Sequence, residues 1–437
     1  MKKEKGKSQS TWQFLVRRSD FTKLVAARHI SVLGDQIHTV TNMWLVQQLT
    51  GSALAMGSVF AANTIPRIIF SLVGGVSVDR YNKKLILIMS DVLRAFGVLV
   101  MALLALTNHL QVWHIALFAA LNGAVAAFFG PAFSATVPNI VEQDELQRAN
   151  ALGGMIVRIA SILGSALGGL IIGAVGTGGG YLVDAASYVL SALFIFSATI
   201  PKPARSDALP PAPGISGVWQ DLKEGLRYIL AQRALLSIVA LSVAVTFVAI
   251  PVAQLLPSFA ENALHLTDAK QVGFLWSGMT LGLFLGALFL NSIYEMPNKV
   301  LGVLISALLF GGGSVVFGLS HVFPVALGSI ILMGFGLGLS TVLTTTLFQT
   351  LVAKEMLGRF FGNIGLLTLG MQPLVMWLAG FAADSSSAAS VLAVLGSLLL
   401  IFSLFWMLQY QTITKAIRRQ EQEAAATKVE TGEIASE

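Results

Sequence analysis

Long apolar stretches separated by short polar connections form the dominant pattern of this 437-residue chain. A helix needs about 20 mostly apolar residues to cross the hydrocarbon core of a bilayer. Twelve stretches reach that length without the strict two-residue alternation of a barrel strand, at about 22–49, 52–78, 85–107, 111–137, 150–176, 179–200, 234–260, 270–293, 298–320, 323–350, 356–382 and 388–410. The pattern therefore predicts an all-α membrane protein with twelve transmembrane helices.

The composition supports this class and excludes several others. Hydrophobic residues make up 55% of the chain and charged residues 11%, far less charge than a soluble domain carries. The chain has no cysteine, which rules out disulfides, thiolate metal sites and cysteine nucleophiles. The segment GTGGG at 176–180 lacks the Gly-Lys-Ser/Thr of a phosphate-binding loop and indicates a tight turn. We expect neither an enzyme nor a metal site.

Lysine and arginine are distributed unevenly between the connections. Of the 28, 23 fall in the even-numbered connections, the two ends and the central linker, whereas the odd-numbered connections hold only Lys270. Cytoplasmic loops carry such an excess, so both termini are predicted to be cytoplasmic in a multi-pass protein of the cell membrane. The net charge of +6 lies on these flanks and suits anionic lipid headgroups, not nucleic acid.

One long internal polar stretch, 201–233, divides the chain. Its first part is rich in proline and reads as a linker, and its second part has the spacing of an amphipathic helix on the inner membrane surface. The predicted organisation is a cytoplasmic segment 1–21, a six-helix half 22–200, the linker, a six-helix half 234–410 and a polar tail 411–437. Two such halves are the architecture of secondary transporters with parallel repeats. We expect a monomer.

A stripe of polar residues marks the first predicted span. Arg28, Ser31, Asp35, His38 and Asn42 share one helical face, which predicts that this face meets a cavity or other helices. A carboxylate at mid-bilayer costs about 2.5–3.5 kcal/mol on insertion scales. Asp35 is therefore interpreted as a proton switch, as half of an ion pair with Arg28 or with a residue of another span, or as a direct contact to cargo. His38 is a proton carrier or a hydrogen-bond partner.

Other charged residues also fall inside spans. Arg158 has no acid on its own helix, so it needs a partner elsewhere, and Asp35 is the obvious one. Together with Asp35 and His38 it is a candidate for proton coupling. Asp91 and Arg94 are three residues apart and predict a local pair near the cytoplasmic end of the third span. Asp184 is predicted to make a structural contact.

The segment GGVSVDRYNKK, residues 74–84, resembles the cytoplasmic signature of the major facilitator superfamily. The matching residues are Gly75, Asp79, Arg80, Lys83 and Lys84. Asn82 stands where the family usually has glycine, and asparagine also tolerates a left-handed turn. The resemblance implies that Asp79 and Arg80 latch the cytoplasmic side of the transporter.

The segments PNIVEQDELQRANALGGMI and DLKEGLRYIL are similar to those of the macrolide-exporter-like branch of drug:proton antiporters. In GSALGG of the fifth span, Ser165 replaces the proline of the antiporter motif, and the fourth span lacks the arginine of many proton-coupled members. The resemblance implies a central cavity lined by the first, fourth, seventh and tenth spans. Candidates for its lining are Asp35, Asn42, Arg67, Asn122, Phe128, Phe129, Thr246, Gln254, Thr345, Gln349 and Gln372.

These features predict a secondary transporter with the major facilitator fold. The first hypothesis is export of hydrophobic or amphipathic drug-like compounds, cationic ones included, by alternating access with the proton gradient as energy source and no bound cofactor. A lysolipid or siderophore carrier of the same fold is the alternative within transport. A membrane receptor or regulator that moves no solute is the alternative from another class.

Overall fold

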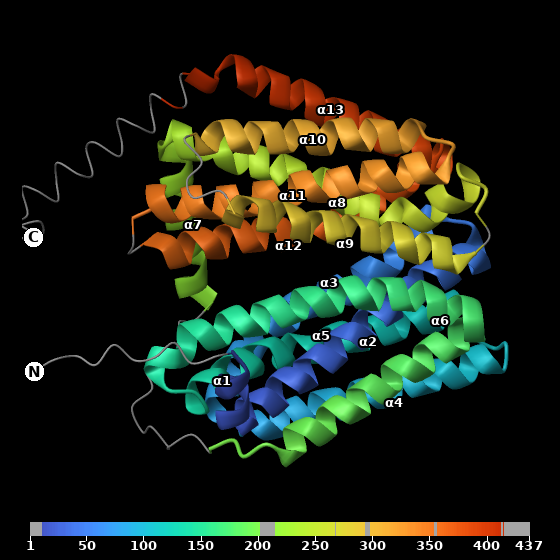
Figure 1. Cartoon of the computed structure of the whole chain (residues 1–437), viewed down its shortest axis with the longest axis vertical. Coiled ribbons are helices and arrows are strands. Elements are labelled where there is room, and N and C mark those ends of the chain that lie inside the picture. Colours follow the sequence, from blue (N-terminus) through green and yellow to red (C-terminus); the bar gives the residue numbers. More distant parts are fainter. Residues whose placement is uncertain are drawn as a thin grey trace, which may run out of the picture. The chain divides into compact units, whose positions relative to one another are not determined.

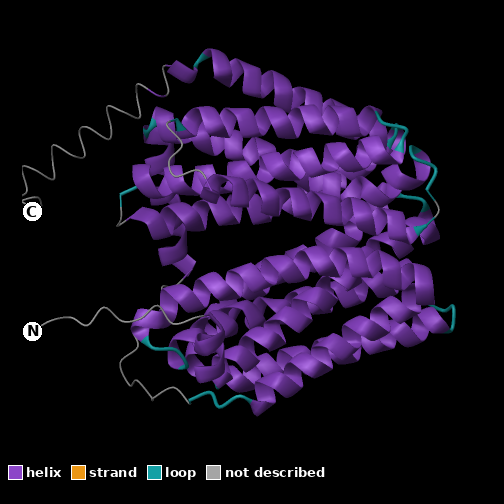
Figure 2. Ribbon diagram, in the orientation of Figure 1, coloured by secondary structure: helices purple, strands orange, loops and turns teal. Residues whose placement is uncertain are grey.

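The computed structural model describes residues 11–201, 215–266, 268–292, 298–353, 356–411 and 414. Throughout this described part the regular structure is helical and contains no strand (Figures 1 and 2). The predicted all-α class is confirmed.

Residues 11–201 form α1 (Thr11–Arg17), α2 (Ser19–Thr50), α3 (Ala53–Arg80), α4 (Lys83–Leu106), α5 (Val112–Thr136) and α6 (Leu146–Ser197). Two 3₁₀ turns, η1 (Val137–Asn139) and η2 (Gln143–Glu145), join α5 to α6. The later helices are α7 (Ile215–Ala231), α8 (Arg233–Asn262), α9 (Ala269–Ser292), α10 (Lys299–Leu319), α11 (Phe323–Leu351), α12 (Leu357–Ser385) and α13 (Ala388–Leu408).

The 52-residue α6 is two helices joined at Gly176, whose φ of 72° and ψ of 179° are not helical. Glycine is the residue that adopts such a positive φ without a steric cost. Before the break α6 runs beside α2 in the same direction, with Ser165 near Gln36, and after it the chain returns, with Tyr181 bonded to Asn42. The tight turn predicted at GTGGG is confirmed, and α6 accounts for two of the predicted spans.

Ten helices of the described residues are long and apolar enough to cross a membrane, with α6 counted once. α2 is not among the ten, because its polar stripe interrupts its apolar character. The molecule is a multi-pass membrane protein.

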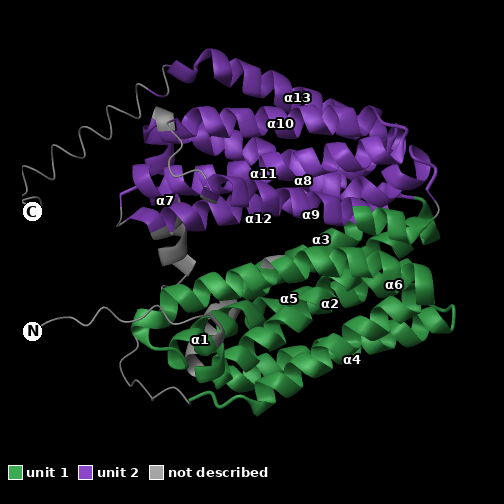
Figure 3. Cartoon of the chain, viewed as in Figure 1, with its two compact units in different colours: residues 1–51, 58–210, 268–274 green, residues 52–57, 211–267, 275–437 purple. Residues whose placement is uncertain are grey.

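The chain forms two compact units (Figure 3). Unit 1 comprises residues 1–51, 58–210 and 268–274, and unit 2 comprises residues 52–57, 211–267 and 275–437. The linker residues 202–214 and most of the predicted tail lie outside the described residues, so those predictions stay predictions.

In unit 1, α2 packs against both arms of α6, and its polar stripe faces other helices as predicted. Ser31 is fully buried, and His38 and Asn42 are each 7% exposed. The helices approach closely at Gly34, where an added Cβ would lie 2.6 Å from Asp184 Oδ1. Polar side chains on this face are therefore paired inside the unit.

The signature segment ends α3 and starts α4. Asn82 has φ −66° and ψ 111°, and its side chain accepts a hydrogen bond from Lys84 N. The expected left-handed turn is therefore wrong: Asn82 is an extended N-cap residue, which satisfies a free amide of the first turn. Lys83 Nζ donates to Ala135 O at 3.2 Å, and Lys84 Nζ donates to Ala198 O at 2.8 Å.

Gly75, Asp79 and Arg80 lie within α3, but their surroundings and side chains fall outside the described part. The latch on the cytoplasmic side therefore stays a prediction. The two lysines of the signature, by contrast, fasten the start of α4 to the ends of α5 and α6 within unit 1.

A charged cluster fastens α1 to the connection between α5 and α6. Arg17 Nη2 lies 2.7 Å from Glu145 Oε1, and Arg18 Nε lies 2.8 Å from Glu145 Oε2. Arg18 also donates to Glu142, and this hydrogen bond holds the pKa of the Glu142 carboxyl below its usual range. We call these four residues the α1 clasp.

The helix predicted within 215–231 is confirmed as α7 in unit 2. Its Ile229 is buried, and its charged residues Lys223, Glu224 and Arg227 are exposed, which agrees with an amphipathic helix. Leu226, expected on the apolar face, is 52% exposed. Glu224 accepts a hydrogen bond from Arg359 at 2.9 Å, so α7 is tied to the first turn of α12. Its placement on the inner membrane surface stays a prediction.

Candidate transport site

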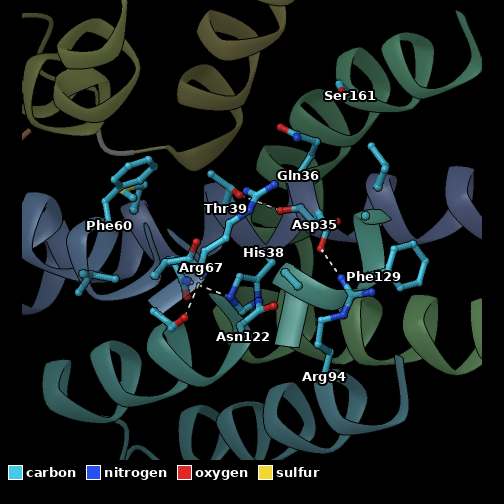
Figure 4. Close-up of a pocket in the computed structure, with 18 of the residues that line it drawn as sticks. Asp35, Gln36, His38, Thr39, Phe60, Arg67, Arg94, Asn122, Phe129 and Ser161 are labelled. Atoms are coloured by element: carbon cyan, nitrogen blue, oxygen red, sulfur yellow. Dashed lines mark hydrogen bonds and ion pairs between the residues drawn. The ribbon is translucent and has the colours of Figure 1, made fainter. Parts of the chain in front are cut away.

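A cavity of about 400 Å³ lies inside unit 1 among α2, α3, α4, α5 and α6 (Figure 4). Its polar lining comes from five helices and consists of Arg28, Asp35, Gln36, His38, Thr39, Asn42, Asn63, Arg67, Arg94, Asn122 and Ser161. Phe60 and Phe129 add aromatic surface. The cavity therefore gathers the stripe of α2 with cations from three helices.

Asp35 is the acid that this cavity exposes, and its side chain is 33% accessible. It accepts a hydrogen bond from the Tyr188 hydroxyl. Figure 4 shows its other contact, in which Asp35 Oδ1 lies 3.8 Å from Arg94 Nη1. Of the two expected partners, Arg28 is corrected: among the described residues, the cation within 4 Å of Asp35 is Arg94. Pairing with Arg158 stays a prediction. The side chain of Arg158 lies outside the described residues.

Arg94 connects Asp35 to a second carboxylate. Its Nη2 donates to Asp91 Oδ1 at 2.5 Å, which confirms the predicted local pair, and Ser191 Oγ donates to Asp91 Oδ2 at 2.6 Å. Its guanidinium carbon also lies 4.4 Å from the ring centroid of Tyr188 and 4.8 Å from that of Phe129. The pair sits midway along α4 and reaches the cavity, so its expected place near a helix end is wrong.

His38 belongs to a separate buried network. Its Nδ1 lies 3.0 Å from Asp184 Oδ2, and its Nε2 lies 2.9 Å from Asn42 Nδ2. Tyr181 donates its hydroxyl to Asn42 Oδ1 at 2.7 Å. The predicted structural contact of Asp184 is thus confirmed, and its partner is His38.

Two further cations line the cavity. The Arg28 guanidinium carbon lies 5.3 Å and 5.8 Å from the ring centroids of Phe129 and Phe133. Among the described residues, neither Arg28 nor Arg67 has an ion-pair or side-chain hydrogen-bond partner. Arg28 also borders an adjoining pocket of about 200 Å³ with apolar walls that include Phe21 and Phe133.

Of the predicted cavity residues, Asp35, Asn42, Arg67, Asn122 and Phe129 line this cavity. Phe128 does not, which is a correction: its ring lies 6.4 Å from that of Phe70, and both border a different pocket. The sequence analysis missed Tyr188 and Tyr181, because two tyrosines in an apolar span give no sign of their partners.

The remaining cavity candidates belong to unit 2 and are Thr246, Gln254, Thr345, Gln349 and Gln372. Gln254 is 1% exposed, and its Nε2 donates to Ala53 O and Met376 O at 3.1 Å each. Thr246 and Thr345 donate to carbonyls of their own helices. In this structure the amide of Gln254 joins α8 to α12 and to the segment 52–57, all within unit 2.

This arrangement is suited to binding and proton exchange. An accessible carboxylate next to an arginine can alternate between ion pair and protonated acid, and the free guanidinium groups can bind a solute. The described residues hold no cluster of three potential metal ligands.

A family model described as "Transmembrane secretion effector" matches residues 9–432, nearly the whole chain. The chain belongs to the transmembrane secretion effector family. This family is a branch of the major facilitator superfamily, so the protein is a transporter and not an enzyme.

Two relatives show how far the likeness of this family member extends. Multidrug efflux pump Tap of Mycolicibacterium fortuitum is 25% identical over 81% of this chain and 86% of its own. Enterobactin exporter EntS of Escherichia coli O81 (strain ED1a) is 27% identical over 87% of this chain and 86% of its own.

Solved structures agree on the fold of the family member. A bacterial homolog to human lysosomal transporter Spinster, inward-facing and unoccupied, superposes with a TM-score of 0.65 at 13% identity, over 92% of this chain and 97% of that one. Nucleoside transporter NupG superposes with a TM-score of 0.67 at 12% identity, over 90% and 99%.

Proposed function

We propose that this protein exports amphipathic small molecules across the cell membrane by alternating access, and that protonation of Asp35 drives the cycle. The observation that carries the proposal is the accessible Asp35 carboxylate in a cavity of unit 1, bonded to Tyr188 and 3.8 Å from Arg94. The names of both relatives, an efflux pump and an exporter, support the direction of transport. Drug-like compounds, macrolides among them, are the first cargo class, and the transporter acts as a monomer.

Asp35 is suited to gain and lose a proton because Arg94 has a second partner. When Asp35 becomes neutral, Asp91 still accepts from Arg94 at 2.5 Å. Protonation therefore leaves no guanidinium buried without a counter-charge, a situation that costs about 3–5 kcal/mol when one partner of a buried pair is removed. Asp35 is also the more exposed of the two acids, since Asp91 is fully buried.

The test is efflux of ethidium from cells that carry wild type or Asp35→Asn, with and without a proton gradient. We expect the gradient-driven efflux rate of Asp35→Asn to be at least tenfold lower than that of wild type, while the variant folds normally. Asp144→Asn, which removes an exposed acid outside the cavity, is the matched control and should export like wild type. Export by Asp35→Asn at the wild-type rate would show that coupling lies elsewhere.

A second candidate is export of an acidic amphipathic compound such as a siderophore. The observation that favours it is the pair Arg28 and Arg67, which have no anionic partner among the described residues. Two guanidinium groups beside one pocket repel a cationic cargo and attract a carboxylate or phenolate. The EntS relative, an enterobactin exporter, agrees with this class.

The two candidates predict opposite effects of pH on binding. A cationic cargo competes with the proton at Asp35, so it binds more weakly as the pH falls. An anionic cargo is repelled by ionised Asp35, so it binds more tightly as the pH falls. Equilibrium binding of ethidium and of the anion 1-anilinonaphthalene-8-sulfonate at pH 5.5 and 7.5 separates the two candidates. Arg67→Gln should weaken the binding of the anion alone, and its dissociation constant should rise by about tenfold for each 1.4 kcal/mol of binding free energy lost.

A further inference from the structure

The buried network around His38 lies beside the cavity but is separate from Asp35. Its members come from α2 and from the returning arm of α6, and Tyr181 and Asp184 are fully buried. Among the described residues, His38 Nδ1 and Asp184 Oδ2 lie 3.0 Å apart as an ion pair, and neither atom has a hydrogen-bond partner of good geometry. His38 itself lines the cavity, so solvent protons can reach it.

The hydrogen bonds determine where the imidazole proton lies. Tyr181 donates its hydroxyl to Asn42 Oδ1, so the other end of that amide, Nδ2, faces His38 Nε2 at 2.9 Å. An amide nitrogen only donates, and Nε2 must therefore present its lone pair. The neutral imidazole therefore carries its proton on Nδ1, the ring nitrogen 3.0 Å from Asp184 Oδ2.

We propose that His38 is a second proton-binding site of this transporter, and that the Asn42 amide turns by half a rotation when His38 binds the proton. The proton adds to the lone pair of Nε2, and the new N–H then faces the amide NH₂ group. Rotation of the amide brings Oδ1 to Nε2 as an acceptor and turns the NH₂ group toward the Tyr181 oxygen. Tyr181 loses its acceptor in exchange.

Asp184 makes this protonation favourable. A fully buried carboxylate beside a neutral imidazole is a lone buried charge, whereas an imidazolium converts the two into a pair. The other charged or titratable groups near the site are Asp35 on α2, Arg67 on α3, Asp91 and Arg94 on α4, and Tyr188 on α6, while α5 contributes the neutral Asn122. Asp184 is the acid in direct contact.

Its role in transport rests on the proposed function, because two proton sites one helical turn apart would allow two protons per cycle. The binding of the proton itself requires no cargo. It is measured by potentiometric titration of the purified, detergent-solubilised protein between pH 5 and 8. The titration curve of wild type minus that of His38→Asn should show a step of one bound proton. The asparagine amide keeps a donor toward Asp184 but does not titrate.

Two further variants separate a proton site from a structural histidine. Tyr181→Phe removes the bond that holds the amide in the neutral arrangement, so the His38 step should move to higher pH by up to about one unit. Asp184→Asn removes the carboxylate that stabilises the imidazolium, so the step should move to lower pH or vanish. A merely structural histidine would give no step in any of these proteins.

Nuclear magnetic resonance of ¹⁵N-histidine-labelled wild type covers the case in which a variant does not fold. We expect a histidine with its proton on Nδ1 at pH 8 that becomes imidazolium by pH 5. A His38 signal that stays neutral, or one with its proton on Nε2 at pH 8, would overturn the proposal. Neither result depends on Asp35→Asn efflux, so failure of this proposal and failure of the proposed function are distinguishable.

Discussion

At the scale of single residues, Arg94 is the buried cation that connects α4 to its neighbours in the cavity of unit 1. Its side chain is 3% exposed, it pairs with Asp91, and it packs against the rings of Tyr188 and Phe129. Arg94→Leu would leave the buried Asp91 without its counter-ion, at a cost of about 3–5 kcal/mol. We expect a clear fall in the thermal unfolding midpoint of the purified protein.

The double variant Arg94→Leu with Asp91→Leu is the control for charge, because it removes both members of the buried pair. An ion pair replaced by apolar side chains often costs little. The double variant should therefore unfold at a higher temperature than Arg94→Leu. Equal midpoints for the two variants would mean that Arg94 stabilises the unit through its ring contacts.

Several residues of this site could be predicted from the sequence, but most of their contacts could not. The stripe with Asp35 and His38 was predictable because helical spacing alone places those residues on one face. The pairing of Arg94 with Asp91 followed from their three-residue spacing. The contacts of Asp35 with Arg94 and Tyr188 were not predictable, since they depend on how α2, α4 and α6 are rotated against one another. His38 and Asp184 are separated by 146 positions for the same reason.

At the scale of helices, the approach of α2 to α6 depends on Gly34. An added Cβ at this position would lie 2.6 Å from Asp184 Oδ1 and 2.7 Å from Ser187 Cβ, too close for the packed helices to accommodate. Gly34→Ala should therefore lower the unfolding midpoint. The matched control is Gly370→Ala in α12, where nothing lies within 4 Å and alanine should leave the midpoint unchanged or raise it. A Gly34→Ala protein as stable as wild type would contradict the close packing.

The α1 clasp should open in acid. Because the hydrogen bond from Arg18 holds the pKa of Glu142 below its usual range, the clasp is stabilised at neutral pH. That stabilisation is present above the ordinary pKa of a glutamate, about 4.3, and is lost as the pH falls through the lower value of the folded protein. A spin label at Val16, which is 62% exposed, should become more mobile below about pH 4.

The absence of cysteine makes this labelling specific, since Val16→Cys introduces the one thiol of the chain. Glu142→Gln with Glu145→Gln should show the mobile spectrum already at neutral pH. High salt should loosen the clasp in wild type, because exposed ion pairs are screened. A label that stays immobile in the double variant would show that the apolar contacts of α1 hold it without the charges.

At the scale of the whole chain, the number and order of the helices followed from hydropathy, and even the reversal at Gly176 could be predicted from a run of glycines. The cap at Asn82 was misread, because asparagine suits both a left-handed turn and a helix N-cap. Hydropathy predicts which segments cross the membrane and in what order. The direction of the chain through the membrane comes from the charges of the connections.

The last prediction tests that direction. If both termini are cytoplasmic, the connection between α4 and α5 and that between α10 and α11 face outward, whereas those between α3 and α4 and between α11 and α12 face inward. Single cysteines at His109, His321, Tyr81 and Ala353, all exposed, report the four connections. In intact cells a membrane-impermeant maleimide should label His109→Cys and His321→Cys, and should label Tyr81→Cys and Ala353→Cys only after the membrane is opened. The reverse pattern would place the termini outside and reverse the assignment of the two faces.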